Sequence, residues 1–142
     1  MLFFIDAEFC VPSDTLISLG IVSEDGNKTF YEVIDYVGKI QDPWVLQNVV
    51  PILQKDPVSF DVFQAKLEEF VSQFAGMEII ANHPSDILYF NKALIKDKGK
   101  WIKIQPLTFV VDDNLSGKGS TLLHNAIHDA QATRKDWLKH YG

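Results

Sequence analysis

Two carboxylates alternate with apolar residues near the start of the chain. Asp6 and Glu8 lie in the segment Leu2–Phe9, which otherwise reads as an apolar β-strand. Residues two apart in a strand project from the same face, so the two side chains are neighbours. Adjacent carboxylates repel and are costly to bury unless a cation neutralises them, and Mg²⁺ and Mn²⁺ prefer such oxygen ligands. The spacing predicts a metal site, with the solvent-exposed end of a strand as the alternative.

A third carboxylate follows a second apolar segment in the middle of the chain. Asp86 comes after an expected buried strand, Met77–Asn82, and lies in the first turn of an expected helix, Pro84–Ile95. Strand ends in α/β sheets are where binding sites collect. The alternative is an ordinary acidic residue in a first turn, where the helix dipole favours negative charge.

A fourth carboxylate and a histidine occur together near the end of the chain. Asp129 is adjacent to Ala130 and close to the face that the last helix packs, so its charge needs a partner. His124 is five residues earlier, about 140° away on a continuous helix. The two converge only if His124 lies at or before the helix start, in a glycine-containing loop. A mobile histidine there suits a general base; a plain surface histidine is the alternative.

The elements that must position these residues are strands in the first third of the chain and alternating helices and strands in the rest. The hydrophobic pattern and the turn residues Asp25 and Gly26 predict a meander of three strands. The order then predicts an α/β fold with a mixed sheet, in which parallel β-α-β crossovers follow the antiparallel meander and helices flank the sheet. The expected strands are Leu2–Phe9, Thr15–Ser23, Lys28–Ile34, Met77–Asn82 and a buried Leu107–Val111. The expected helices are a short one from Asp42-Pro43-Trp44, Ser59–Phe74, Pro84–Ile95 and one from near His124 to Lys139.

Composition narrows the class of protein. The 142 residues fit a single domain over 1–142, and the one cysteine excludes an internal disulfide framework. The net charge of −6 argues against a protein that coats long nucleic acid. It does not exclude an enzyme that binds a short end of nucleic acid, because bound cations can reverse the sign of the charge at a local site. The start of the chain is apolar for only five residues, which predicts neither a signal peptide nor a membrane span. We expect a soluble cytoplasmic protein with no membrane partner.

In this order the motifs resemble the DEDDh branch of the DnaQ-like 3′–5′ exonucleases, which share an RNase H-like fold. The family's Asp-x-Glu motif matches Asp6 and Glu8, and its second motif matches Asp86. Its third, His-x-Ala-x-x-Asp-Ala, matches His124, Ala126, Asp129 and Ala130. The hairpin sequence ISLGIVSEDG–FYEV, the pair Trp44-Val45 and the run NVVPIL most resemble the small single-domain exoribonuclease branch. His128 is a rival for the histidine role, but the motif spacing favours His124.

The resemblance implies hydrolysis of phosphodiester bonds from the 3′ end of single-stranded nucleic acid, RNA favoured, with release of nucleoside 5′-monophosphates. Asp6, Glu8, Asp86 and Asp129 would hold two Mg²⁺ or Mn²⁺ ions, and His124 would accept the proton of the attacking water. Phe9 and Trp44 are candidates to stack on terminal bases, with core packing as the alternative. Loop lysines could meet phosphates or be solvated: Lys96, Lys98, Lys100, Lys103 and Lys118. A homodimer would be compatible with such a family.

Three other functions stay open. One is a 3′–5′ DNA exonuclease of proofreading or repair type, since the residue that would read the 2′-hydroxyl cannot be located. Another is a catalytically silent RNase H-like module that binds a partner. The last is a different metal hydrolase, for which the His-x-Ala-x-x-Asp-Ala match is a coincidence.

Overall fold

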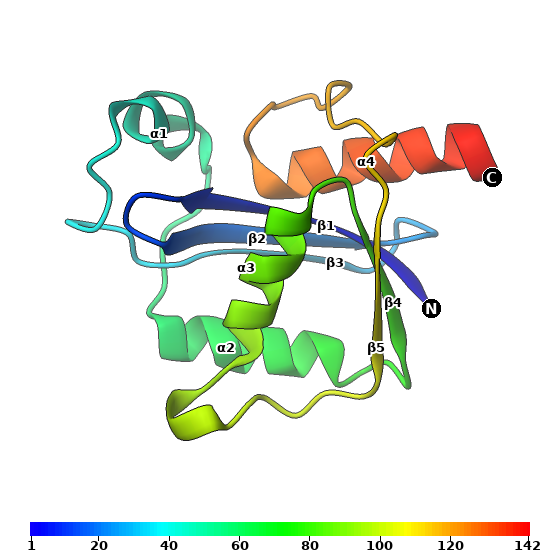
Figure 1. Ribbon diagram of the computed structural model, residues 1–142, viewed down its shortest axis with the longest axis horizontal. Helices are drawn as coiled ribbons and strands as arrows, with labels where there is room; N and C mark the ends of the chain where they lie inside the picture. Colours follow the sequence, from blue (N-terminus) through cyan, green and yellow to red (C-terminus); the bar gives the residue numbers. More distant parts are fainter.

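The computed structural model describes residues 1–142 and contains one five-stranded sheet in the order β3-β2-β1-β4-β5 (Figure 1). Its strands are β1 (Leu2–Cys10), β2 (Thr15–Ser23), β3 (Thr29–Val33), β4 (Met77–Ala81) and β5 (Leu107–Val111). β1 to β3 pair antiparallel, whereas β4 pairs parallel with both β1 and β5. The predicted α/β class and mixed sheet are therefore confirmed.

The turn between β2 and β3 forms for local reasons. Gly26 has φ +79°, a left-handed conformation that glycine adopts without steric cost. The Asp25 carboxylate accepts hydrogen bonds from the Ser23 hydroxyl at 2.6 Å and from the Asn27 backbone N–H at 2.9 Å. These contacts close the hairpin and set the register of the meander.

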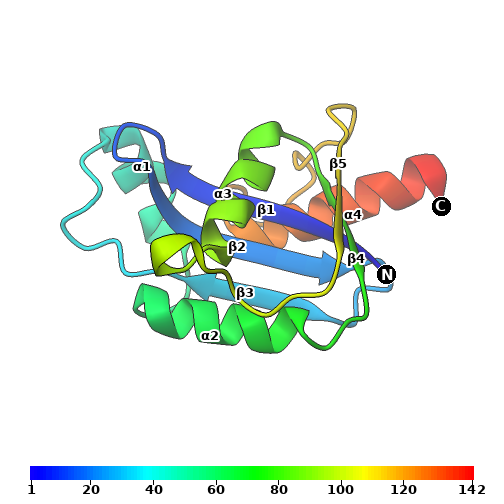
Figure 2. The same cartoon turned by 60° about the horizontal axis from the view of Figure 1, so that its bottom comes forward.

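Helices cover both faces of the sheet. The two on one face are α2 (Phe60–Val71) and α3 (Pro84–Leu94), and α4 (Ala126–Tyr141) covers the other, as Figure 2 shows. Phe3 and Ile5 of β1 belong to the large core under α2 and α3, whereas Phe4 packs with Ala130 of α4. Because successive strand residues alternate in direction, Asp6 and Glu8 project to the α4 side, as Phe4 does.

Three short helices complete the fold. They are α1 (Pro43–Asn48), the 3₁₀ helix η1 (Val50–Ile52) and the 3₁₀ helix η2 (Asp97–Gly99). Asp42 caps α1 by accepting a hydrogen bond from the Trp44 N–H at 3.0 Å, and Pro43 occupies the first helical position. The segment α1–η1 packs its apolar residues against Cys10, which is 1% exposed and is the only thiol.

One expectation about an individual element is wrong. Leu107–Val111 is not buried, since Val110 and Val111 are 37% and 45% exposed. The reason is its place at the edge of the sheet, where β5 pairs with β4 alone. The expectation of a last helix that starts near His124 is confirmed: the helix begins at Ala126, two residues after His124, because the side chain of Asn125 caps it. None of the helices combines the length and the apolar composition needed to cross a membrane.

Candidate active site

The first pair of acidic residues lies in the central part of β1. Asp6 is opposite Gly20 of β2, and Glu8 is opposite Ser18. Because they share a strand face, each carboxyl group affects the pKa of the other. A register irregularity between Glu8 and Phe9 follows immediately. Such bulges bend a strand and re-aim its side chains, and they are frequent beside functional sites.

Asp86 reaches the same strand from the start of α3. The pairing of β1 with β4 ends at Phe4, so the backbone N–H of Ala7 has no strand partner on that side. The Asp86 carboxylate takes this hydrogen bond at 3.0 Å, and the residue is 4% exposed. The side chain of His83 caps α3 by accepting from the Ser85 N–H at 3.0 Å, which fixes the helix start that carries Asp86.

Asp129 and His124 meet at the start of α4. His124 lies two residues before the helix, with φ 74°, and its backbone N–H donates to the Asp129 carboxylate at 3.0 Å. Possible ligand atoms of Glu8, His124 and Asp129 all lie within 4.8 Å of one another. The structure therefore brings together carboxylates from three distant stretches of the chain, with a histidine beside them.

The surroundings of all four carboxylates oppose their negative charge. Burial raises the pKa of Asp6 well above its ordinary value, and the charges of neighbouring acidic groups, led by Asp86, raise it further. Burial likewise raises the pKa of Glu8 to about 9, with a further contribution from the charge of Asp129. It raises the pKa of Asp86 to about 6, although the Ala7 N–H favours the ionised form, and raises that of Asp129.

Two carboxylate oxygens in this group are buried without any hydrogen-bond partner, Asp6 Oδ2 and Asp129 Oδ1. Unpaired buried oxygen atoms of this kind are costly, and their cost disappears when a cation accepts their lone pairs. Carboxylates are the ligands that Mg²⁺ and Mn²⁺ prefer. The donor set present fits a divalent cation site.

Gly20 of β2 also shapes the site, and the sequence analysis did not identify this role. A Cβ at this position would lie 2.5 Å from the Ala126 carbonyl carbon and 2.6 Å from the Ile127 nitrogen. The start of α4 therefore rests directly on the β2 backbone, next to Asp6 in the ladder, and this close approach brings Asp129 to β1. The signal in the sequence was a glycine inside a largely apolar strand, which can mark a close approach of another backbone.

The two aromatic residues predicted to stack on bases have different surroundings. Phe9 stacks on Tyr89 of α3, with ring centroids 4.3 Å apart, and packs against the large core. Trp44 is 51% exposed, and its ring meets that of His124 edge-on at a centroid distance of 5.0 Å. Trp44 thus presents an accessible ring beside the acidic group, whereas Phe9 is partly buried and its ring already stacks on a protein side chain.

His128 stands apart from the carboxylates. Its Nδ1 is 2.8 Å from the Thr121 hydroxyl. His124, by contrast, belongs to the group of possible ligand atoms with Glu8 and Asp129. The choice of His124 as the base remains a prediction, which variants of the two histidines can test.

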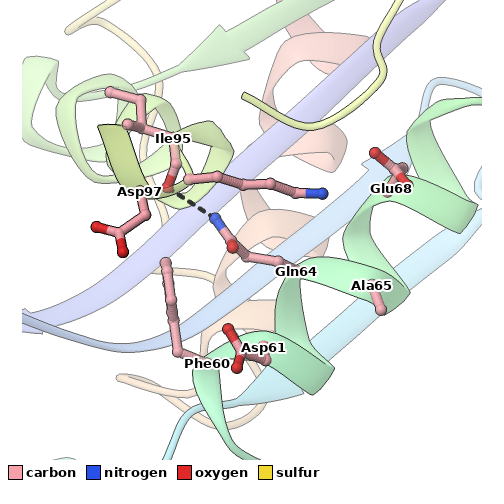
Figure 3. A pocket seen from close by; sticks show the side chains of 8 residues that line it. Phe60, Asp61, Gln64, Ala65, Glu68, Ile95 and Asp97 are labelled. Carbon is pink, nitrogen blue, oxygen red and sulfur yellow. Dashed lines mark hydrogen bonds between the residues drawn. The ribbon is translucent and has the colours of Figure 1, made fainter. Parts of the chain in front are cut away.

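A hollow of about 670 Å³ lies elsewhere, between α2 and the segment after α3 (Figure 3). Gln64, near its centre, donates a hydrogen bond to the Ile95 carbonyl at 2.8 Å, and acidic side chains such as Asp61 and Glu68 surround it. None of the four carboxylates on β1, α3 and α4 lines it.

Comparison of the chain with protein-family models and with curated proteins found no match in either case.

Proposed function

We propose that this chain is a metal-dependent 3′–5′ exonuclease with an RNase H-like fold, of the DEDDh type that its motifs resemble. The proposal rests on one observation above all. Asp6, Glu8 and Asp129 converge with Asp86 beside His124, and two of their buried oxygens have no partner within the protein. The mixed sheet, with helices on both faces, is compatible with such a fold.

In this proposal the four carboxylates bind the metal ions, and His124 transfers a proton. Asp6, Glu8, Asp86 and Asp129 would hold two Mg²⁺ or Mn²⁺ ions. When bound, such ions neutralise the phosphodiester and make water a nucleophile at neutral pH. His124 accepts the proton of the attacking water at a ring nitrogen, and its half-buried place before α4 lets the imidazole reach solvent afterwards.

Two contacts orient the groups for this reaction. The Ala7 N–H holds the Asp86 carboxylate against β1, and the backbone N–H of His124 holds that of Asp129. Each bond leaves the other oxygen of its carboxylate for a cation. Preorganised charged groups contribute to catalysis because they need not rearrange as the reaction proceeds.

The proposed substrate is the 3′ end of single-stranded RNA, with single-stranded DNA as the second choice. The proposed place of action is the cytoplasm. The exposed ring of Trp44 beside His124 supports a single-stranded substrate, because aromatic rings stack on bases of any sequence. The net charge of −6 supports a short grip on the terminus rather than a long tract.

The direct test is cleavage of 5′-labelled single-stranded RNA and DNA with Mg²⁺, with Mn²⁺ and with a chelator. We expect a ladder that shortens from the 3′ end, release of nucleoside 5′-monophosphates, and no reaction with the chelator. If neither substrate is cut with either metal, the nuclease proposal fails and a binding module takes its place.

Asp6→Asn tests the role of the carboxylates. We expect the rate to fall by at least about 100-fold, the upper end of the cost of losing an outer partner of a metal site. Metal-free stability should be unchanged or higher, because asparagine carries no charge that burial and the neighbouring carboxylates of Asp86 and Glu8 would oppose. Asp61→Asn, an exposed change on α2, is the matched control and should leave the rate unchanged. Full activity in Asp6→Asn contradicts the metal assignment.

A further inference from the structure

The cap of α4 makes more contacts than a cap requires. Asn125 is 1% exposed, and its Oδ1 accepts the His128 backbone N–H at 3.4 Å. Its Nδ2 points away from the helix, toward the carbonyl oxygens of Ile52 at 3.0 Å and Leu53 at 3.3 Å. The same nitrogen is 3.3 Å from the Tyr31 hydroxyl. One buried amide thus joins the start of α4 to η1 and to β3.

Tyr31 strengthens the same junction from the sheet. Its hydroxyl donates to the Leu53 carbonyl at 2.6 Å, so that carbonyl lies within reach of two donors. Lys55 holds the following residues to β3, through the Tyr31 carbonyl at 2.7 Å and the buried Glu32 carboxylate at 2.6 Å. We name the contacts among Asn125, Tyr31 and the carbonyls of Ile52 and Leu53 the Asn125 clasp.

The segment that the clasp holds carries Trp44. From α1 to Leu53 this segment packs on the sheet through a small apolar cluster that includes Val45 and Val49. Apolar packing is not directional, whereas the clasp fixes the segment relative to the first turn of α4. At the other end of the segment, the Trp44 ring meets His124, the residue immediately before Asn125.

The choice of amino acid at position 125 supports a role beyond capping. Serine and aspartate cap helices about as well as asparagine, because the cap needs only a side-chain oxygen. Neither combines that oxygen with an NH₂ group that can reach carbonyls on the other side. The carbonyls of Ile52 and Leu53 and the Tyr31 hydroxyl thus explain why an amide side chain, and not a hydroxyl or carboxylate, occupies this position.

We propose that Asn125 is a positioning residue that locks the α1–η1 segment onto the start of α4 and so holds Trp44 against His124. The structural part of this inference stands without any assumption about activity. Its consequence for the reaction rests on the proposed exonuclease function, in which His124 carries the proton and Trp44 meets the terminal base.

The test compares Asn125→Ser, which keeps a capping oxygen but loses the Nδ2 contacts, with Ser59→Ala, which removes the cap of α2 instead. Hydrogen exchange of the full chain is followed at amides protected inside the segment, those of Leu46, Val49 and Leu53. We expect their exchange to accelerate about tenfold in Asn125→Ser, as the loss of one or two net hydrogen bonds implies. In Ser59→Ala the same amides should exchange as in the unaltered chain.

Tyr31→Phe provides a second variant, since it removes only the hydroxyl donated to Leu53, and it should accelerate the same amides. On 5′-labelled RNA we expect kcat of Asn125→Ser to fall about tenfold, because small displacements of catalytic groups are costly. Unchanged exchange in both variants, or faster exchange with an unaltered kcat, overturns the proposal. If the unaltered chain cuts no nucleic acid, the function fails while the exchange comparison still decides the clasp.

Discussion

His124 is one of four residues other than glycine that have a positive φ angle. It adopts φ 74°, a left-handed backbone that costs most residues other than glycine of the order of 1–3 kcal/mol. The conformation turns its N–H onto the Asp129 carboxylate and its ring toward Glu8 and Trp44. Strain that persists beside unpaired carboxylates agrees with a functional demand on this position.

The two neighbouring histidines give a prediction at this scale. His124→Ala should reduce cleavage of RNA by at least about 100-fold, the lower end of what a general base contributes. His128→Ala should retain most of the activity, because its ring contacts Thr121 and not the carboxylates. The measurement is kcat for both variants under identical Mg²⁺ or Mn²⁺. If His128→Ala is slower than His124→Ala, then His128 and not His124 is the general base.

Single residues differ in how far the sequence predicts them. The alternation of Asp6 and Glu8 in an apolar strand is readable, because strand geometry alone makes them neighbours. The contact of Asp86 with Ala7 is not readable, since it depends on where the pairing of β1 with β4 ends. The exposure of Trp44 and the partial burial of Phe9 were also left open, because aromatic residues serve both cores and binding surfaces.

At the scale of elements, the docking of α4 on β2 decides whether the carboxylates meet. Gly20 gives the helix its close approach, and Asn125 fixes where the helix starts. The sequence predicted the order of the main helices and strands, because hydrophobic periodicity is local. It misjudged the burial of Leu107–Val111, since an edge strand and a central strand have the same apolar composition.

Gly20→Ala should separate α4 from the sheet. The new methyl group meets backbone atoms of Ala126 and Ile127, which cannot rotate away, so we expect a loss of about 1–3 kcal/mol in unfolding free energy. Activity should fall as well, because Asp129 moves with the helix. Gly76→Ala is the matched control, since the nearest atom to its new Cβ is 3.7 Å away. Equal stability and activity of the two variants would show that Gly20 is not needed to position α4 and Asp129.

At the scale of the whole molecule, a net charge of −6 and a cluster of buried and half-buried carboxylates link stability to pH and to cations. In the unfolded chain these groups lose their protons near pH 4, but in the folded chain Asp86 holds its proton to about pH 6 and Glu8 to about pH 9. A raised pKa in the folded state contributes stability below pH 4 that is lost as the pH rises through the folded values.

The metal-free protein should therefore melt at progressively lower temperature between about pH 5 and pH 9. A divalent cation that binds the ionised carboxylates should reverse this loss, most strongly at the alkaline end, by about 2.7 kcal/mol at 100 times its dissociation constant. Thermal melting across this pH range, with chelator and with Mn²⁺, measures both effects. A melting temperature that neither falls with pH nor responds to Mn²⁺ would contradict the cluster as a cation site.

The burial of Cys10 has a practical consequence for such measurements. As the only thiol in the chain, it lies at the end of β1 with 1% of its surface exposed, beneath the segment that carries Trp44. A sulfhydryl reagent can modify it only while that covering segment is lifted or the chain is unfolded. The rate at which Cys10 is labelled therefore measures how often the covering segment opens in the unaltered protein, without an introduced probe.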